Sequence, residues 1–145
     1  MYTNDSVRIC VRLCDLCDVK NRQLTQYLKG KDSDISLNYD LRYLYAIIAS
    51  PVIRFYFFEL ICGGLHIYPN EIRIFPIKKV DKDKQKPFIK IVDKILAITG
   101  SGDYSENPAK QAKVKEYENQ IDQLVYKLYE LTPEEIKIVE NSNKK

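Results

Sequence analysis

The strongest constraint on the fold is a heptad pattern of apolar residues in the last third of the chain. The apolar positions recur at alternating steps of three and four residues: Val114, Tyr117, Ile121, Leu124, Leu128 and Leu131. An α-helix completes a turn every 3.6 residues, so this spacing places all of them on one stripe. We predict that this stripe, called the helical seam below, packs against a partner helix.

The run of residues just before the seam supplies the partner. Its apolar residues share one helical face: Phe88, Ile91, Val92, Ile95 and Ile98. The turn-rich stretch Thr99–Asp103 separates the two runs and lets the chain reverse. The pattern therefore predicts a long antiparallel helical hairpin over residues 85–131, of the coiled-coil kind. Such a hairpin is a device for spacing or pairing modules and is poor evidence for catalysis.

Upstream of the hairpin, residues 38–62 predict a pair of helices divided at Ser50–Pro51. A serine caps the second helix well, and a proline fits the first helical position because its missing N–H would be unpaired there. Residues 65–80 contain Pro69 and Pro76, which limit any strand, so we expect an extended segment.

The two ends of the chain carry weaker signals. Apolar residues alternate with polar ones over Val7–Leu13, which predicts a short strand. Thr132–Glu135 has the order of a capping box and predicts a short C-terminal helix. The fold class expected is mainly α, with some α+β character. The regions expected are an N-terminal segment, the helical pair with its extended segment, the hairpin region and a tail: 1–36, 37–80, 81–141 and 142–145.

The charge of the chain permits nucleic-acid binding without demanding it. The 23 basic and 20 acidic side chains give a formal charge of +3, and many DNA-binding domains are more basic. The best basic strip lies around the extended segment, and its residues are predicted to contact DNA phosphates: Arg54, Arg73, Lys78, Lys79 and Lys82. Ordinary surface charge is the alternative that the spacing leaves open.

No apolar run approaches the roughly 20 residues that a membrane helix needs. The chain opens without the basic start and apolar core of a secretory signal. We therefore expect a cytoplasmic protein that contacts no membrane and keeps its cysteines as thiols.

Cys10, Cys14 and Cys17 form the sharpest local motif. Three cysteines at this spacing can hold an iron–sulfur cluster, and Cys62 or His66 could complete a zinc site with them. The spacing overlaps the predicted strand, and no glycine-rich cofactor loop follows it. We favour thiols without a metal, and keep the cluster and the zinc as alternatives.

Motifs that bind phosphates or catalytic metals are absent from the sequence. It has no Walker loop, no G-x-G-x-x-G, no H-E-x-x-H and no Asn/Asp-Pro-Pro-Tyr/Phe tetrad. His66 is the only histidine, and the sequence places no nucleophile or orienting acid beside it. We predict that the chain is not an enzyme on its own.

A series of four phrases resembles the end of a known kind of domain. In chain order they are LRYLYAIIASPVIRFYF (Leu41–Phe57), IFPI (Ile74–Ile77), QKPFIKIVDKIL (Gln85–Leu96) and IDQLVYKLYELTPEEIKIVE (Ile121–Glu140). This series resembles the C-terminal part of TaqI-like specificity domains, the target-recognition domains of type II restriction enzymes and adenine-specific DNA methyltransferases. They are similar to type I specificity subunits.

The resemblance implies a DNA-specificity or scaffold fragment of a restriction–modification system. It would help to direct an N6-adenine DNA methyltransferase, perhaps with an endonuclease, to its target. S-adenosylmethionine is expected only in that methyltransferase domain, and no cofactor is expected in this chain. DNA, the methyltransferase or endonuclease, and a second copy of the chain are the expected partners. A docking or dimerisation module without a DNA role is the alternative, and a metal protein built on the three cysteines is the third hypothesis.

Overall fold

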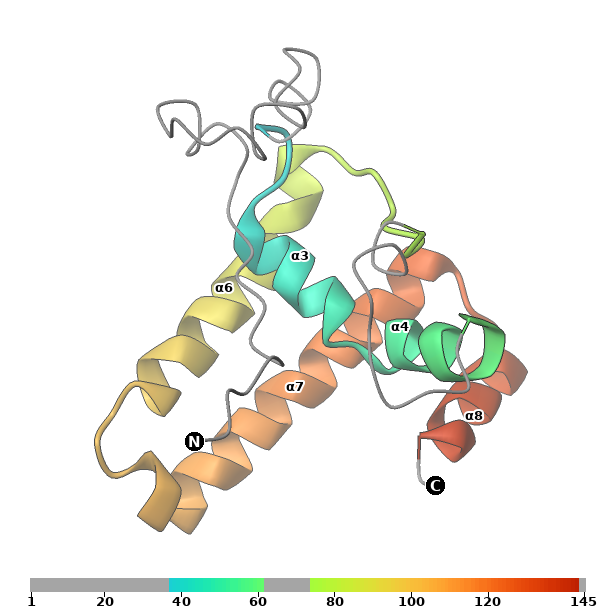
Figure 1. Cartoon of the computed structure of the whole chain (residues 1–145). Helices are drawn as coiled ribbons and strands as arrows, with labels where there is room; N and C mark the ends of the chain where they lie inside the picture. Colours follow the sequence, from blue (N-terminus) through green and yellow to red (C-terminus); the bar gives the residue numbers. More distant parts are fainter. Residues whose placement is uncertain (1–36, 62–73, 144–145) are drawn as a thin grey trace, which may run out of the picture. The chain divides into compact units, whose positions relative to one another are not determined.

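The computed structural model describes residues 37–61 and 74–143 of the chain. The chain divides into two compact units, Met1–Leu41 and Arg42–Lys145, and the arrangement below is that of the second. The elements follow in the order α3 (Leu41–Ile48), α4 (Pro51–Phe55), η2 (Tyr56–Ile61), α6 (Lys82–Thr99), η3 (Tyr104–Glu106), α7 (Pro108–Tyr129) and α8 (Pro133–Ser142) (Figure 1). The described ranges contain helices and no strand, so the predicted mainly α fold is confirmed. The strand predicted at Val7–Leu13 lies outside them.

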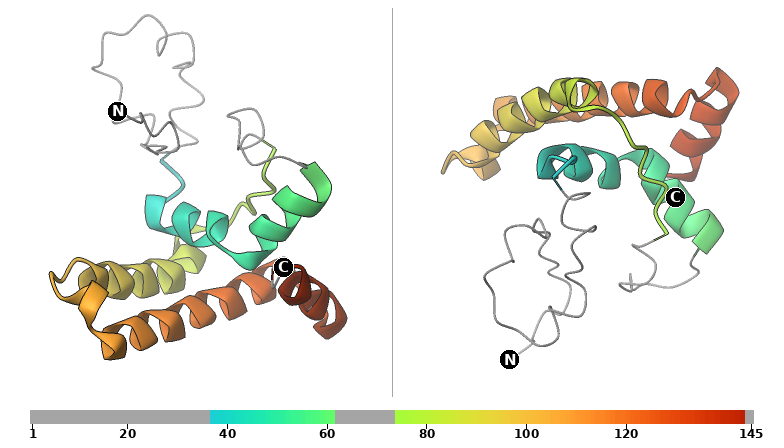
Figure 2. Two further views of the ribbon diagram at one scale, coloured as in Figure 1. Left: turned by 60° about the horizontal axis from the view of Figure 1, so that its bottom comes forward. Right: turned by 90° about the horizontal axis from the view of Figure 1, so that it is seen from above.

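Helices α6 and α7 form the predicted antiparallel hairpin and lie side by side in all views (Figures 1 and 2). Helix α6 begins at Lys82, slightly before the predicted start of the hairpin at residue 85. Phe88, Val92 and Ile95 are buried on its inner face, at steps of three and four. One apolar stripe of α6 therefore faces the core, as the sequence pattern requires.

The buried face of α7 is wider than the helical seam. Within the seam, Val114 and Ile121 are buried, and the remaining members are half-buried: Tyr117, Leu124, Leu128 and Leu131. Val125 and Tyr126 lie outside the seam and are also buried. Helix α7 contacts α4 as well as α6. Two neighbours on different sides demand a broader apolar face than the narrow stripe of a two-helix coil.

A hydrogen-bond network closes the turn between α6 and α7. The side-chain oxygen of Asn107 caps α7 by accepting from the N–H groups of Ala109 and Lys110, at 3.1 and 3.2 Å. The Lys110 ammonium, followed by Asn107 and Ser101, lowers the pKa of the Asp103 carboxyl to about 2. The turn is thus held by polar side chains that the heptad pattern alone does not reveal.

Helix α7 ends at Tyr129, and the residue that caps it, Glu130, has a φ of 59° and a ψ of 36°. The N–H of Leu131 bonds the carbonyl of Tyr126 at 3.1 Å, and the N–H of Glu130 bonds that of Lys127 at 3.2 Å. This pair of bonds is the Schellman arrangement, in which a left-handed residue usually is glycine. Within the described ranges, Glu130 is the single non-glycine residue with positive φ.

Residues 74–80, called the strap below, belong to the extended segment expected at 65–80, before the hairpin. The first part of that segment, residues 65–73, lies outside the described ranges. No strand pairs with the strap in the described part of the chain. Its carbonyls at alternate residues accept instead from side chains: Pro76 from the Tyr129 hydroxyl at 2.7 Å, Lys78 from the Tyr43 hydroxyl at 2.7 Å, and Val80 from the Gln85 amide at 3.2 Å. Backbone acceptors that would otherwise lack partners are thereby satisfied.

Helices α3 and α4 form a second layer against the hairpin (Figure 2). The ring of Tyr43 meets the ring of Phe88 edge-on, with 5.3 Å between centroids. The guanidinium of Arg42 donates to both carboxylate oxygens of Asp93, each at 2.9 Å. These contacts join α3 to α6 within the second unit.

The predicted division at Ser50–Pro51 is present. Ser50 caps α4, with Pro51 at its start, and the Ser50 hydroxyl donates to the Ile47 carbonyl at 2.7 Å. Beyond Phe55 the helix continues as the π-helix η2, where the sequence predicts a plain α-helix.

Helix α8 opens with the predicted capping box. The Thr132 hydroxyl accepts from the Glu135 N–H, and the Glu135 carboxylate accepts from the Thr132 N–H at 2.7 Å. The end of α8 is hydrogen-bonded to the start of α4, since the side-chain amide of Asn143 donates to the Pro51 carbonyl at 3.1 Å.

In the described residues, no single helix has the length and apolar character to cross a membrane. The helix pair Leu41–Ile48 and Pro51–Glu59, which is bent by 53°, has the length and composition of a membrane span when its two parts are taken together. The apolar residues Tyr43, Ile47 and Ile53 of this pair are buried inside the protein.

Candidate functional site

Three of the residues predicted to contact phosphates lie exposed on the surface. Arg54 is exposed on α4, with its guanidinium carbon 5.9 Å from the centroid of the Phe58 ring. Lys79 lies near the end of the strap, and Lys82 is the first residue of α6. Both side chains are exposed. Arg73 lies outside the described residues. Lys79 on the strap and Lys82 at the start of α6 are thus three residues apart, while Arg54 belongs to α4.

Lys78, the remaining member of the predicted strip, has structural partners. Its ammonium donates to the Leu128 carbonyl at 2.7 Å and to the Glu130 carboxylate at 3.1 Å. Carbonyls in the last turn of a helix lack intrahelical donors, and the helix dipole favours a cation there. Lys78 therefore caps α7, and a phosphate would have to displace two partners to bind it.

Helix α6 carries a row of exposed lysines, of which only the first is among the residues predicted to contact phosphates. The row, called the lysine row below, consists of Lys82, Lys86, Lys90 and Lys94. Residues four apart stand one turn apart on the same side of a helix. The buried residues Phe88, Val92 and Ile95 occupy the other side. The step of four was readable in the sequence and is the signal that would have found the row.

Three of these lysines do not serve the stability of α6; the exception is Lys94, whose ammonium lies 5.3 Å from the centroid of the Tyr117 ring on α7. Its first turn holds Lys82 and Lys84, and its last turn holds no basic residue, whereas the helix dipole favours cations at the C-terminal end. Like charges four residues apart also cost about 0.2–0.5 kcal/mol per pair. Partial relief comes from Asp83, which pairs with Lys86 at 2.6 Å. An anion bound along the row would remove the remaining repulsion.

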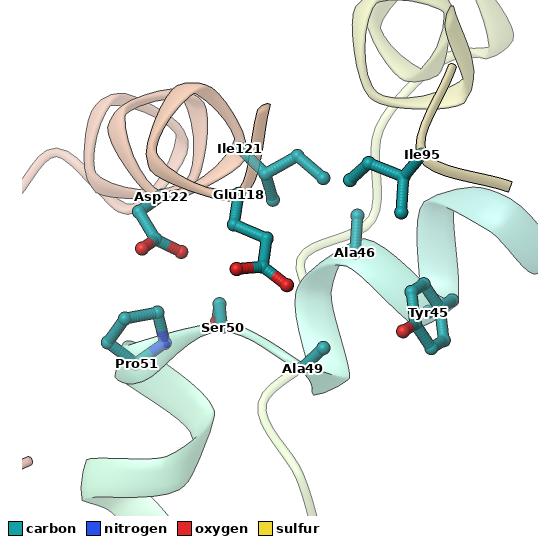
Figure 3. A pocket seen from close by; sticks show the side chains of 9 residues that line it. All are labelled: Tyr45, Ala46, Ala49, Ser50, Pro51, Ile95, Glu118, Ile121 and Asp122. Atoms are coloured by element: carbon teal, nitrogen blue, oxygen red, sulfur yellow. The ribbon is translucent and has the colours of Figure 1, made fainter. Parts of the chain in front are cut away.

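A pocket of about 260 Å³ opens between α3, α6 and α7 (Figure 3). Figure 3 shows Glu118 and Asp122 pointing from α7 toward the Ser50–Pro51 turn. The rest of the lining is mostly apolar or aromatic: Tyr45, Ala46, Ala49, Ile95 and Ile121.

The carboxyl of Asp122 lies partly buried in the lining of this pocket. Burial, followed by the negative charges of Glu118 and Glu140, raises the pKa of Asp122 to about 6. The neighbouring Tyr126 responds in the same way: burial, with Asp122 and Glu140, raises the pKa of its phenol to about 12. A carboxyl that titrates near neutral pH can exchange protons, and such carboxyls are common in active sites.

The described lining of the pocket does not assemble a nucleophile and a base. The Ser50 hydroxyl already donates to the Ile47 carbonyl and caps α4. The single histidine, His66, lies outside the described residues. Among the residues that line the pocket, the arrangement supplies apolar contact and negative charge, without the paired groups of acyl-transfer chemistry.

Within the described ranges, no group of three or more histidine, cysteine or acidic residues could hold a metal ion. The hypothesis of a cluster or zinc site concerns other positions, all outside those ranges: Cys10, Cys14, Cys17, Cys62 and His66.

The chain was compared with protein families, curated proteins and solved structures. No protein-family model matches the chain, and no curated protein or solved structure is detectably similar to it.

Proposed function

We propose that the chain is a non-catalytic DNA-specificity or scaffold fragment of a restriction–modification system. It would help to direct an N6-adenine DNA methyltransferase, with or without an endonuclease, to its target. The observation that carries the DNA role is the row of exposed lysines on α6, of which Lys82, Lys86 and Lys90 lie opposite its buried face. Such a surface attracts phosphates through charge, independently of base sequence.

The restriction–modification setting comes from the resemblance of the four sequence phrases. The first phrase forms α3, α4 and the start of η2, and the second lies in the strap. The third lies in α6, and the fourth covers the end of α7 and most of α8. Segments far apart in the sequence thus build one packed unit, which supports reading the series as a single module. S-adenosylmethionine would be bound by the methyltransferase partner.

The experiment is a titration of the full chain into a labelled DNA duplex of about 20 base pairs, followed by fluorescence anisotropy. Binding is measured at several salt concentrations between 50 and 200 mM. We expect the logarithm of the binding constant to fall linearly with the logarithm of salt, with a slope of about −3 for three to four phosphate contacts. Absence of binding at 50 mM salt would remove the DNA role.

The methyltransferase partner is tested separately. An adenine methyltransferase that lacks its own recognition domain is mixed with the chain, and methylation of DNA is mapped by site. We expect methylation to become confined to particular sites when the chain is present. An unchanged pattern would contradict the restriction–modification setting, even if the chain binds DNA.

A protein-docking module is the second candidate, and the outer face of α3 favours it. Tyr45 is 58% exposed and Ile48 is 40% exposed, and they stand three residues apart on one side of the helix. Exposed aromatic and aliphatic groups that adjoin are typical of protein interfaces. Sedimentation of the chain distinguishes self-association through this face: Tyr45→Ser with Ile48→Ser should give a monomer if the face pairs two copies.

A further inference from the structure

We propose that the lysine row of α6 follows the phosphate backbone of one strand of duplex DNA. The hairpin would then contact DNA along the length of α6 and would not act as a spacer alone. This inference rests on the proposed DNA role and names its surface. It moves the expected phosphate contacts from the strap, where Lys78 already caps α7, to the outer side of α6.

The length of the row suits a nucleic-acid backbone. From Lys82 to Lys94 the axis of α6 extends about 18 Å. Over that distance each strand of a DNA duplex carries about five phosphates. Lysine side chains are long and flexible, so the ammonium groups of Lys82, Lys86 and Lys90, at one-turn intervals, can each reach a phosphate oxygen. The Lys94 ammonium lies 5.3 Å from the centroid of the Tyr117 ring on α7 and would leave that ring to reach a phosphate. The exposed Lys79 on the strap precedes the row and extends it.

The net charge around the lysine row is positive, which suits the phosphate backbone of DNA. Residues 79–94 contain six lysines and three aspartates. Asp93 is engaged by the Arg42 guanidinium at 2.9 Å, and Asp83 pairs with Lys86 on the surface, with 85% of its side chain exposed. An exposed ion pair of this kind is weak in water, so a phosphate can replace Asp83 as the partner of Lys86.

The opposite charge lies on the second half of α7 and on α8. Residues 116–140 contain seven acidic residues and two lysines. Phosphates would be repelled there and attracted by α6. The chain would therefore approach DNA in one orientation, with α6 toward the duplex.

The experiment compares two triple variants of the full chain that change the net charge equally. The row variant carries Lys82→Gln, Lys86→Gln and Lys90→Gln. The matched control carries Lys115→Gln, Lys127→Gln and Lys137→Gln, at exposed positions of α7 and α8. Circular dichroism first establishes that both variants melt like the wild-type chain. Binding to the labelled duplex is then measured from 50 to 200 mM salt.

We expect the row variant to bind at least about tenfold more weakly, with a salt slope shallower by about 2 to 3, because about 0.9 is lost per phosphate contact. The control should bind much more like the wild-type chain. Equal weakening in both variants would overturn the inference, because only net charge would then matter. A row variant that binds like the wild-type chain would also overturn it, while leaving the DNA role intact. If the wild-type chain binds no duplex, the proposed DNA role fails together with the inference.

Discussion

Glu130 ends α7 in a left-handed conformation that its side chain disfavours. The φ of 59° costs about 1 kcal/mol for a residue with a Cβ, and the partner ion pair with Lys78 is exposed and weak. We therefore expect Glu130→Gly to raise the free energy of unfolding by about 0.5 kcal/mol, since glycine suits this position. Urea denaturation measures the change. Glu130→Val should lower the same quantity, and stabilisation by valine would contradict the backbone assignment.

Asp122 should make stability depend on pH in the direction opposite to most carboxylates. Its pKa is raised from 3.8 to about 6, so between these values the folded chain binds a proton that the unfolded chain releases. The free energy of unfolding from this group therefore falls as pH rises through that window and stays low at pH 7.

Asp122→Asn removes that dependence. Because the carboxyl is partly exposed, we expect only about 1 kcal/mol of added stability at pH 7. The gain should disappear near pH 4. Thermal melts of the wild-type chain and of the Asp122→Asn variant, from pH 4 to pH 7, measure the difference in stability. Groups that titrate in both proteins cancel in this difference. A gain that is constant with pH would contradict the assigned cause.

Among the helices, α7 depends most on its contact with two neighbours. Val125 is 0% exposed although it lies outside the helical seam, so Val125→Asp would bury an unpaired carboxylate. We expect a loss of about 3 kcal/mol or more. Gln123→Asp, at an exposed position of the same helix, is the matched control and should change little. Similar urea midpoints for the two variants would show that α7 does not pack as described.

The strap depends on side-chain donors and not on a partner strand. Tyr43→Phe removes the hydroxyl that donates to the Lys78 carbonyl, and Tyr129→Phe removes the donor to Pro76. We expect each substitution to cost about 1 kcal/mol. Native-state hydrogen exchange should also show faster exchange of the Ile77 amide, which bonds within the strap. Unchanged exchange and stability in the double variant would contradict this account.

The elements that the sequence predicts well are those specified by local patterns. The hairpin follows from heptad spacing, the start of α4 from Ser50–Pro51, and α8 from the capping box at Thr132. The donors of the strap escape prediction because Tyr43 and Tyr129 act on carbonyls 35 and 53 residues away. For the candidate site, the place of Lys82 beside the extended segment predicts a phosphate contact. The rest of the lysine row lies inside the predicted hairpin, and its step of four residues is readable in the sequence.

At the scale of the whole described unit, charge is divided between the helices. Lysines gather on α6, whereas acidic residues gather on the second half of α7 and on α8. Helices α6 and α7 pack against each other, so the two charge regions belong to the two arms of one hairpin and to α8. Under the proposed function, a hairpin with one basic side would position a partner enzyme relative to DNA.

The most direct test is lysine footprinting of the full chain with and without duplex DNA. Acetylation of each lysine by an amine-reactive reagent is quantified by mass spectrometry. We expect DNA to protect Lys82, Lys86 and Lys90, and to leave the reactivity of Lys127 and Lys137 unchanged. Protection confined to lysines outside α6, or no protection at a DNA concentration that saturates binding, would contradict the account.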